Sequence, residues 1–365
     1  MTWRNRVEVS YGALRANVVA VRAAAGGRDV IAVAKADAYG LGLERCARIY
    51  HQAGVKALAV AATVEADRVR RMVPEARVIL LSSPLPEERS AVVASAYEVC
   101  LSSMDEVHEF ASLATARSPH PVHVHVDTGM GRFGALPDEA ATLVRAVLAA
   151  PSLRLAGIST HYPNAADGTL SRIQESTFAA LIDSLPPLPA DCWIHYANSE
   201  GLMLRPRGPT NAVRVGLLLT GILPTGCPDP GITPSLTWIS SISLVKRLPA
   251  GHGISYNRSH VLARDSIVGV VPVGYADGLP IALSNKGSVL IQGSRCRILG
   301  RVTMDYCMVD CTDLPRVPAP GEPVVLFGRQ GDAAIAVTDL ADLAGTIPYD
   351  ILCGLRGRCD VVGVP

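Results

Sequence analysis

The residue of this sequence best suited to covalent chemistry is a lysine that directly follows a short apolar run. Residues 30–34 form the run, Lys35 comes next, and Tyr39 and Gly40-Leu41-Gly42 follow. A lysine whose stem lies in apolar surroundings has a lowered pKa and can form a Schiff base with a carbonyl group. The tyrosine hydroxyl and the glycine backbone could approach a phosphate group. The alternative is a lysine that leaves a strand end and reaches solvent.

Four other polar side chains end or interrupt apolar runs. Arg132 follows Gly129-Met130-Gly131, where glycines let the backbone come close and a guanidinium can pair with an anionic oxygen. His161 and His195 each end a run, and Arg214 lies inside one, where an unpaired charge would be costly. The alternatives are that Arg132 is a surface arginine in a turn, that His161 and His195 are hydrogen-bonded core residues, and that Arg214 belongs to a structural ion pair.

Polar islands also separate the apolar runs in the last third of the chain. They lie at residues 253–257, 274–278 and 300–305, and the first contains Tyr256. This tyrosine could act as an acid or base if a cationic neighbour lowered its pKa, and packing is the alternative. The sequence has no Gly-x-Ser-x-Gly, His-Glu-x-x-His or P-loop motif, so the corresponding hydrolases and nucleotide enzymes are disfavoured.

Short apolar runs that alternate with amphipathic segments must position these residues. Continuous runs bounded by polar residues are typical of parallel strands buried on both faces. We expect strands at residues 30–34, 57–61, 77–81, 98–101, 122–127, 155–160, 193–196 and 212–218. Helices are expected after Ser10 and at residues 65–72, 87–96, 104–116, 138–149 and 171–185. This α/β pattern predicts a TIM (β/α)8 barrel, with a doubly wound sheet as the rival.

The character of the sequence changes after Gly221. Residues 223–234 are rich in proline and glycine and indicate a connection. Strands are expected beyond it at residues 236–246, 266–273, 288–291, 295–299, 308–310 and 323–327, with a late helix at 341–344. We therefore expect a barrel domain at residues 1–228, whose first strand could pair with the C-terminal domain, and a mostly antiparallel β domain at residues 229–365.

Composition excludes several classes of protein. The chain has 365 residues, a formal net charge of +1, 49% hydrophobic and 18% charged residues, which disfavours disorder and a nucleic-acid partner. Mean hydropathy is positive at +0.26, yet no run approaches the roughly 18 apolar residues of a membrane helix. The charged N-terminus shows no signal peptide, and nine scattered cysteines without a Cys-x-x-Cys pair predict a reduced, cytoplasmic protein without a metal site.

Taken together, these motifs resemble the alanine racemase family, whose members are pyridoxal-phosphate enzymes of fold type III. The Lys35–Gly40 segment and the Gly274–Gly278 motif carry the resemblance, which extends over residues 7–358. It implies an eight-stranded α/β barrel, a C-terminal β domain and a homodimer whose sites lie between one subunit's barrel and the other's β domain. It also implies pyridoxal 5′-phosphate as cofactor, an amino-acid substrate, and an isomerase that interconverts L- and D-alanine for peptidoglycan synthesis.

The resemblance further implies two opposite bases. Lys35 would hold the cofactor and serve the D-enantiomer, and Tyr256 of the partner subunit would serve the L-enantiomer. Arg214 would face the pyridine nitrogen, where it can only donate and so weakens the ring as an electron sink. The remaining cofactor contacts would be Tyr39, His161, Ser199, Gly216, Leu217 and Tyr349. The substrate contacts would be Arg132, Met304 and Tyr275.

Three positions depart from the family pattern. His125 stands where many relatives carry a lysine, often carbamylated, so Arg132 must be positioned differently. Ile281 replaces an arginine of the entry corridor, and the aspartate after His161 is shifted by one, to Asp167. These departures leave open a racemase of serine or of a broader set of amino acids. A basic-amino-acid decarboxylase and a non-catalytic pyridoxal-phosphate carrier are less favoured, because the tyrosine and the β domain match the racemase arrangement.

Overall fold

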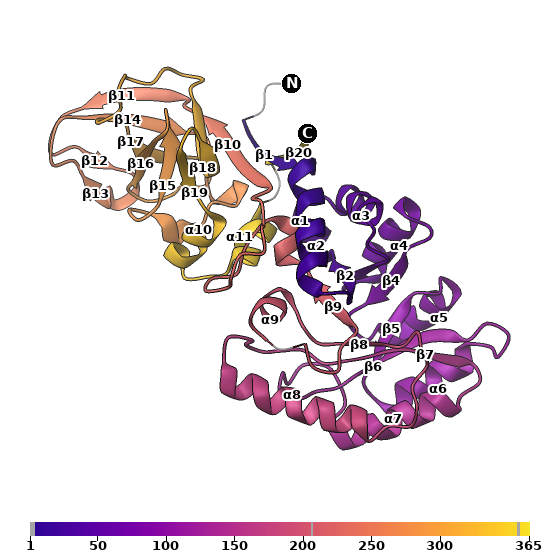
Figure 1. Ribbon diagram of the computed structural model, residues 1–365. Coiled ribbons are helices and arrows are strands. Elements are labelled where there is room, and N and C mark those ends of the chain that lie inside the picture. The colour runs from indigo at the N-terminus through magenta and orange to yellow at the C-terminus, as the bar shows by residue number, and fades with distance from the viewer. Residues whose placement is uncertain (1–3, 206, 356–357) are drawn as a thin grey trace.

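The computed structural model describes residues 4–205, 207–355 and 358–365, which form an eight-stranded and a ten-stranded sheet together with a small two-stranded one. Figure 1 shows the two large sheets in separate halves of the molecule, with helix α1 (Tyr11–Ala25) at their junction. The first and last described strands, at Asn5–Ser10 and Asp360–Val364, pair in parallel beside this helix. Segments far apart in the sequence therefore meet at the junction of the two halves.

The first half is a barrel of parallel strands. The strands are β2 (Asp29–Val33), β3 (Ala57–Val60), β4 (Arg77–Leu80), β5 (Glu98–Leu101), β6 (His120–His125), β7 (Leu153–Ser159), β8 (Trp193–His195) and β9 (Ala212–Val215). Each pairs in parallel with the next along the chain from β2 to β8, and β2 also pairs with β9. Because the first and last strands meet, the predicted TIM barrel is confirmed and the doubly wound sheet is excluded.

The barrel closes between β8 and β9 through a side chain rather than a regular ladder. The Asn211 side chain accepts the Ile194 N–H at 2.7 Å and donates to the Cys192 carbonyl at 2.9 Å. Two backbone hydrogen bonds assist it, from Asn211 to Ile194 at 3.1 Å and from Arg214 to Ala197 at 2.8 Å. This seam therefore holds Arg214, one of the expected site residues.

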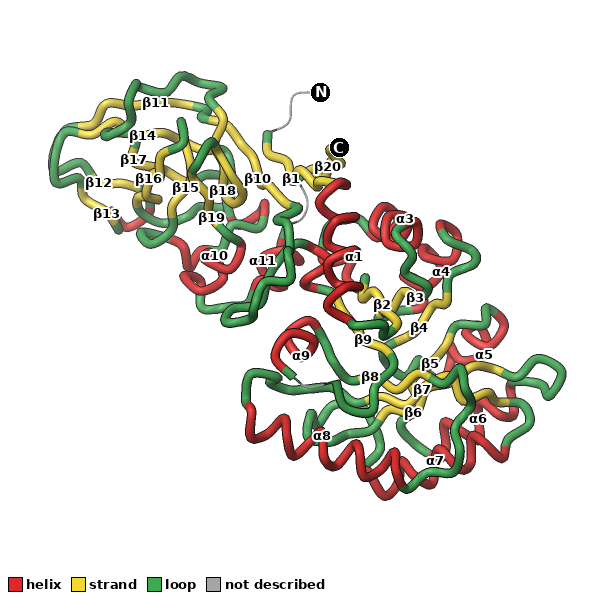
Figure 2. The backbone as a smooth tube through the Cα atoms, viewed as in Figure 1, coloured by secondary structure: helices red, strands yellow, loops and turns green. Residues whose placement is uncertain are grey.

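Helices cover the outside of the barrel (Figure 2). Ser10 caps α1 as predicted, since its Oγ accepts the Ala13 N–H at 3.2 Å. The others are α2 (Lys35–Tyr39), α3 (Leu43–Gln52), α4 (Thr63–Met72), α5 (Pro86–Ala94), α6 (Met104–Leu113), α7 (Pro137–Ala149), α8 (Gly168–Asp183) and α9 (Ser199–Leu204). Helices α3 and α9 were not expected, because the turn-forming residues before them obscure the start of a short helix.

The second half is a mostly antiparallel sheet, as predicted. Its spatial order is β11-β14-β17-β16-β15-β18-β10-β1-β20, with β19 paired to β18. The bounds are β1 (Asn5–Ser10), β10 (Leu236–Ser241), β11 (Leu244–Leu248), β14 (Ser266–Val271), β15 (Ser288–Ile291), β16 (Ser294–Leu299), β17 (Cys307–Asp310), β18 (Pro323–Gln330), β19 (Ala333–Ile335) and β20 (Asp360–Val364). A ribbon of β12 (Gly253–Ile254) and β13 (His260–Val261) and helices α10 (Val337–Ala344) and α11 (Pro348–Gly354) complete it.

The structure corrects one expected strand of this half. Residues 236–246 are not one strand but belong to β10 and β11, which pair with different neighbours. The buried side chain of Ile242 fills the bend between them, so the apolar run looks continuous in the sequence. Strand β1, from the start of the chain, also lies in this sheet, antiparallel to β10 and parallel to β20.

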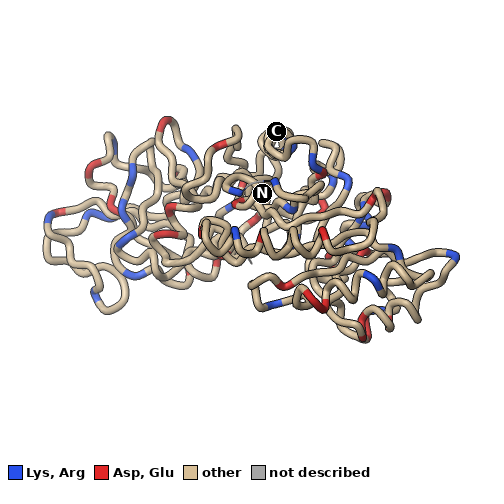
Figure 3. The backbone as a smooth tube through the Cα atoms, turned by 60° about the horizontal axis from the view of Figure 1, so that its bottom comes forward, with Lys and Arg blue, Asp and Glu red and all other residues tan. Residues whose placement is uncertain are grey.

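Charged residues of both signs occur in both halves, and Figure 3 shows their positions interspersed along the backbone. Within the described part of the chain, no helix combines the length and the apolar character needed to span a membrane. The buried core consists of the barrel strands, the inner faces of their helices and the interior of the β domain.

Candidate active site

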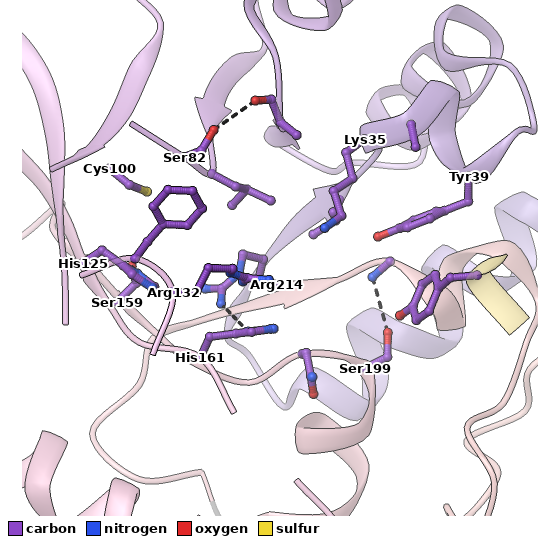
Figure 4. A pocket seen from close by; sticks show the side chains of 18 of the residues that line it. Lys35, Tyr39, Ser82, Cys100, His125, Arg132, Ser159, His161, Ser199 and Arg214 are labelled. Atoms are coloured by element: carbon purple, nitrogen blue, oxygen red, sulfur yellow. Dashed lines mark hydrogen bonds between the residues drawn. The ribbon is translucent and has the colours of Figure 1, made fainter. Parts of the chain in front are cut away.

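A cavity of about 450 Å³ opens where the barrel strands end. Because parallel strands end at the same rim, residues far apart in sequence meet there. Figure 4 shows Lys35 and Tyr39 projecting from one side toward His161 and Arg214. The expected site residues that line the cavity are Lys35, Tyr39, Arg132, His161, Ser199, Arg214, Gly216 and Tyr349.

A turn of left-handed helix follows Lys35. The φ angles of the next four residues are 53°, 57°, 54° and 57° at Ala36, Asp37, Ala38 and Tyr39. This conformation costs L-residues roughly 1–2 kcal/mol each. Helix α4 holds the turn, since Glu65 accepts the Ala36 N–H at 2.6 Å and Arg68 donates to Asp37 at 2.6 Å. The backbone after the lysine is therefore fixed in a shape that isolated chains avoid.

The Lys35 ammonium lies in surroundings that disfavour its charge. Burial lowers its pKa from the ordinary value, and the positive charges of Arg132 and Arg214 lower it further. An amine that loses its proton more easily is a better nucleophile and a better base near neutral pH. The environment of Lys35 thus supports both covalent attachment to a carbonyl compound and proton transfer.

A cradle of hydroxyl groups and glycine backbone lies beside the lysine. Ser199 Oγ accepts the Gly216 N–H at 3.3 Å, and the Tyr39 and Tyr349 rings pack with centroids 5.0 Å apart. A Cβ at Gly216 would lie 2.2 Å from the Tyr39 hydroxyl oxygen, so only glycine fits there. Burial raises the pKa of Tyr39 well above its ordinary value and that of Tyr349 to about 12, so both hydroxyls remain donors. This group of hydroxyl and backbone N–H donors suits an anion with several oxygen atoms.

Leu217 supports this cradle from behind. It begins the 3-10 turn Leu217–Thr220 and is buried, and its side chain is not part of the cavity wall. Its neighbour Leu218 donates its backbone N–H to Ser199 Oγ at 3.3 Å. Any contact from Leu217 to a bound group would therefore be made through its backbone.

Arg214 is buried and hydrogen-bonded on two sides. Nη1 donates to His195 Nδ1 at 2.6 Å, and Nη2 donates to the Thr160 carbonyl at 3.0 Å. Nη2 also donates to His161 Nδ1 at 2.9 Å, the bond drawn in Figure 4. Burial lowers its pKa to about 10, so it is charged at neutral pH. Because arginine can only donate, both Nδ1 atoms must accept. These bonds use three of the five N–H donors of a guanidinium, which leaves donors for an acceptor in the cavity.

His161 is neutral at the cavity wall. Burial and then the charges of Arg214 and Arg132 lower its pKa to about 2. A neutral imidazole that accepts at Nδ1 carries its proton on Nε2. His161 therefore offers one N–H donor whose direction is fixed by its bond to Arg214.

His125 occupies the family's lysine position and is buried. One ring nitrogen lies 2.8 Å from Ser159 Oγ, and burial with the nearby charges of Arg214 and Arg132 lowers the pKa of His125 to about 3. No carbamate can form on this neutral ring. Among the described residues Arg132 makes no ion pair, and its guanidinium lies 5.8 Å from the Phe133 ring centroid. Asp167, the shifted aspartate, caps α8 by accepting the Thr169 and Leu170 N–H groups.

Besides Leu217, the structure places three expected site residues outside this cavity. Tyr256 is 65% exposed, Tyr275 42% and Met304 52%, all between strands of the β domain. These loops support each other, since Tyr275 donates its N–H to the Thr303 carbonyl at 3.0 Å. Within one chain, then, the cavity holds Lys35 and not Tyr256.

Several wall residues were not singled out from the sequence. They include Ser82, Cys100, Phe133, Ser159, Ile347 and Cys353. Ser159 ends β7, so its place at the rim follows from the barrel pattern once the strand's last residue is known. Ile347 directly precedes α11, and Cys353 lies in it. Only the packing of the C-terminal segment against the barrel brings these two residues to the cavity.

The sequence of the chain matches two family models in tandem. Residues 9–224 match the model described as "Alanine racemase, N-terminal domain", and residues 235–362 match "Alanine racemase, C-terminal domain". The chain belongs to the alanine racemase family. The prediction of this family, and of an isomerase, is thereby confirmed.

Curated relatives and solved structures agree with this assignment. The alanine racemase of Symbiobacterium thermophilum is 38% identical over 98% of this chain and 95% of its own length. The alanine racemase structure from Streptomyces coelicolor superimposes with a TM-score of 0.91 at 33% identity, covering 99% of this chain and 98% of that one. The structure from Bartonella henselae, described with covalently bound pyridoxal phosphate, has a TM-score of 0.91 at 27% identity over 100% of both chains.

The residues of the cavity fit the cofactor of this family. Pyridoxal phosphate carries an aldehyde, an acceptor ring nitrogen and a phosphate group. Lys35 offers an amine with a lowered pKa, Arg214 offers a donor, and the hydroxyl cradle leaves space at Gly216 that a Cβ would fill. Each functional group of the cofactor thus has a matching partner in one cavity.

Proposed function

We propose that this chain is a pyridoxal-phosphate-dependent alanine racemase with Lys35 and Tyr256 of the partner subunit as its two bases. The observation that carries the proposal is the meeting, in one cavity, of the Lys35 amine, the Arg214 donor and the cradle around Gly216. Lys35 Nζ would hold the cofactor aldehyde, and Tyr39, Ser199, Tyr349 and the backbone near Leu217 would bind its phosphate. The bound cofactor supplies a conjugated ring that withdraws electrons from the substrate Cα.

The two bases would exchange the Cα proton from opposite faces. Lys35 Nζ takes a proton from, or returns it to, one face of Cα, and the Tyr256 hydroxyl does so on the other. Inversion needs both, because a single base returns the proton to the face from which it came. Proton transfer by a positioned side chain is worth roughly 10²- to 10⁴-fold in rate.

Arg214 would limit side reactions. It would donate to the ring nitrogen of the bound cofactor and, with a pKa of about 10, would not hand its proton over near neutral pH. A ring nitrogen that stays unprotonated draws less charge from Cα, so protonation away from Cα is suppressed. His161, whose Nδ1 is held by Arg214, presents its Nε2–H to the cavity and would connect Arg214 with the incoming tyrosine.

The second copy would complete the site. Tyr256, Tyr275 and Met304 are exposed in the β domain, whereas the tyrosines among the described residues that line the Lys35 cavity, Tyr39 and Tyr349, both belong to the hydroxyl cradle. We propose that residues 229–365 of one chain close the cavity of residues 1–228 of another, in a homodimer. Arg132 would then bind the substrate carboxylate, with Met304 and Tyr275 of the partner subunit beside it. We place this enzyme in the cytoplasm.

The proposal is tested by chiral product analysis with a panel of L-amino acids, including alanine and serine. Alanine is expected to racemise fastest. Faster turnover of serine would favour the broader racemase that His125 and Ile281 leave open. The absence of Cα proton exchange in deuterated water would favour a pyridoxal-phosphate carrier. The visible absorbance of the bound cofactor should disappear in Lys35→Ala. If this variant retained both the absorbance and racemisation, the proposal would be contradicted.

Mixed dimers test whether the site is shared. A Lys35→Ala chain and a Tyr256→Phe chain are each expected to be inactive alone. Random mixing makes half of the dimers mixed, and each mixed dimer regains one of two sites, so about one quarter of the activity should return. No recovery, with dimer exchange verified by mass, would contradict a site between subunits.

A further inference from the structure

A chain of buried polar side chains continues from Arg214 into the barrel interior. His195 Nε2 lies 3.2 Å from His123 Nδ1, and His123 Nε2 lies 2.8 Å from Glu98 Oε2. Glu98 also accepts from Arg77 Nε at 2.6 Å and from Arg77 Nη2 at 2.8 Å. We call His195, His123, Glu98 and Arg77 the core network. The first three are at most 3% exposed.

Donor and acceptor chemistry permits one arrangement of protons in this network. Arg214 can only donate, so His195 accepts at Nδ1 and, being neutral, donates from Nε2. His123 must then accept at Nδ1, which excludes its doubly protonated form, and donate from Nε2 to Glu98. Burial lowers the pKa of His195 well below its ordinary value. Burial raises the pKa of Glu98, but hydrogen bonds from Arg77 and His123 outweigh it and lower that pKa to about 2.

The outer end of the network is itself anchored. The Arg77 guanidinium lies 3.6 Å from the centroid of the Trp193 ring, and the Trp193 indole N–H donates to Asp29 at 3.1 Å. Arg77 begins β4 and Glu98 begins β5, so this anchor lies at the end of the barrel opposite the cavity. The network therefore spans the barrel interior from one mouth to the other.

We propose that His123, Glu98 and Arg77 are positioning residues that hold the Arg214 guanidinium in its productive orientation by fixing the tautomer of His195. The inference rests on the proposed function, because it assigns Arg214 its role toward the cofactor. The opposite tautomer would set a His195 N–H against the Arg214 Nη1–H across 2.6 Å, and the guanidinium would have to move. Arg214 lies at the seam, where β9 forms a regular ladder with β2 alone.

The direct test is nitrogen-15 spectroscopy of the histidines in the holoenzyme, with resonances assigned by single substitutions. Chemical shifts distinguish the Nδ1–H and Nε2–H tautomers and the charged ring. His195 and His123 are expected as neutral Nε2–H tautomers at pH 7. An Nδ1–H tautomer or a charged ring at either residue would overturn the proposal. This measurement does not require a substitution at Glu98.

A kinetic test uses Glu98→Gln. Glu98 Oε1 accepts from Arg77 Nε, and Oε2 accepts from both Arg77 Nη2 and His123 Nε2. The NH₂ of the amide therefore opposes an Arg77 N–H in either orientation, and if it also faces His123, both histidines must take the opposite tautomer. We expect kcat/KM to fall about 10- to 100-fold, as for small misplacements of a catalytic group. Cofactor affinity, measured by titrating the cofactor-free chain, should fall as well, and the His195 resonance should shift.

Glu175→Gln is the matched control. Glu175 accepts from Arg205 at 2.8 Å and 3.0 Å and from the Tyr162 hydroxyl at 2.7 Å, so the same isosteric change is made at a similar ion pair outside the network. Its kcat/KM should stay within about threefold of the unaltered enzyme, in line with the small effects of changes remote from a site. Equal kinetic losses in both variants would mean that Glu98 acts only through stability. An inactive wild-type chain with the expected tautomers would contradict the proposed function alone.

Discussion

The two halves of the molecule treat buried charge in opposite ways. The barrel buries three charged side chains, Glu98, Glu106 and Arg214, and four histidines, His120, His123, His125 and His195. Among the described residues, the β domain buries one charged side chain, Asp277. The barrel thus holds charged side chains in its interior, and one of them, Arg214, reaches the cavity. The β domain keeps an apolar interior and carries its functional candidates on exposed loops.

Removal of the two bases tests this contrast most severely. Lys35→Ala should lower racemisation by more than about 10⁴-fold and abolish cofactor attachment, because both roles are lost together. Tyr256→Phe should lower it roughly 10²- to 10⁴-fold while cofactor absorbance and thermal stability stay unchanged, since the side chain is 65% exposed. Comparable loss of cofactor binding in both would contradict the separation of roles between the halves.

Mild acid should destabilise the barrel before the β domain. Burial lowers the pKa of His120 to about 4, His125 to about 3 and His161 to about 2. Below pH 6.5 the unfolded chain binds protons that the folded barrel excludes, so stability falls as pH drops from 6.5 toward 4. Each histidine can contribute about 1.4 kcal/mol per pH unit.

Glu98 adds to this loss at lower pH. Its folded pKa of about 2 lies below the unfolded value of 4.5, so its contribution is present above pH 4.5 and fades toward pH 2. Pulsed hydrogen exchange with mass spectrometry, after incubation between pH 7 and pH 4, resolves the two halves. Earlier loss of protection in β domain peptides would refute the prediction.

Asp277 is the counterpart test in the β domain. Its carboxylate accepts the Gly274 N–H at 2.9 Å and two bonds from Arg358 at 3.2 Å. Asp277→Asn should destabilise the protein by about 1–3 kcal/mol in denaturant titrations, because a buried acceptor is replaced by a donor. Asp313→Asn, which breaks an ion pair that is largely exposed, should destabilise the protein much less and serves as the control.

The smallest expected effect concerns the left-handed turn. Ala36→Gly relieves roughly 1–2 kcal/mol of strain, which the flexibility of glycine offsets by about 0.5–1 kcal/mol. Stability should therefore rise by no more than about 1.5 kcal/mol, while cofactor affinity weakens because Lys35 is held less firmly. Ala96→Gly, at a φ of 53° away from the cavity, should alter stability similarly and leave cofactor affinity unchanged. Equal affinities in both variants would show that the turn does not position the lysine.

The sequence predicts the barrel well because strands buried on both faces are continuous apolar runs. Each of the eight expected runs overlaps an observed strand. The β domain is harder, since half-buried strands alternate and Ile242 bridges a bend that separates two of them. Helix α11, which carries Tyr349, was not foreseen because it is short and begins at Pro348.

Within the site, motifs at strand ends could be read from the sequence, and contacts through the core could not. Lys35, His161 and Arg214 each end or interrupt an apolar run and meet at the cavity. Glu98 and His123 lie inside strands, 25 residues apart in sequence, and nothing local distinguishes them from isolated polar residues. Pairing of β5 with β6 brings Glu98 beside His123, and only closure of the barrel places both behind Arg214.

Strand β1 has a consequence for the order in which the chain can assemble during synthesis. Its partners are β10, which begins at Leu236, and β20, which ends at Val364. Chains grow from the N-terminus, and long-range strand pairing must wait until both strands exist. A barrel can therefore close on the ribosome once β9 has emerged, while β1 remains unpaired until β10 follows it and gains its second partner only when β20 has been made.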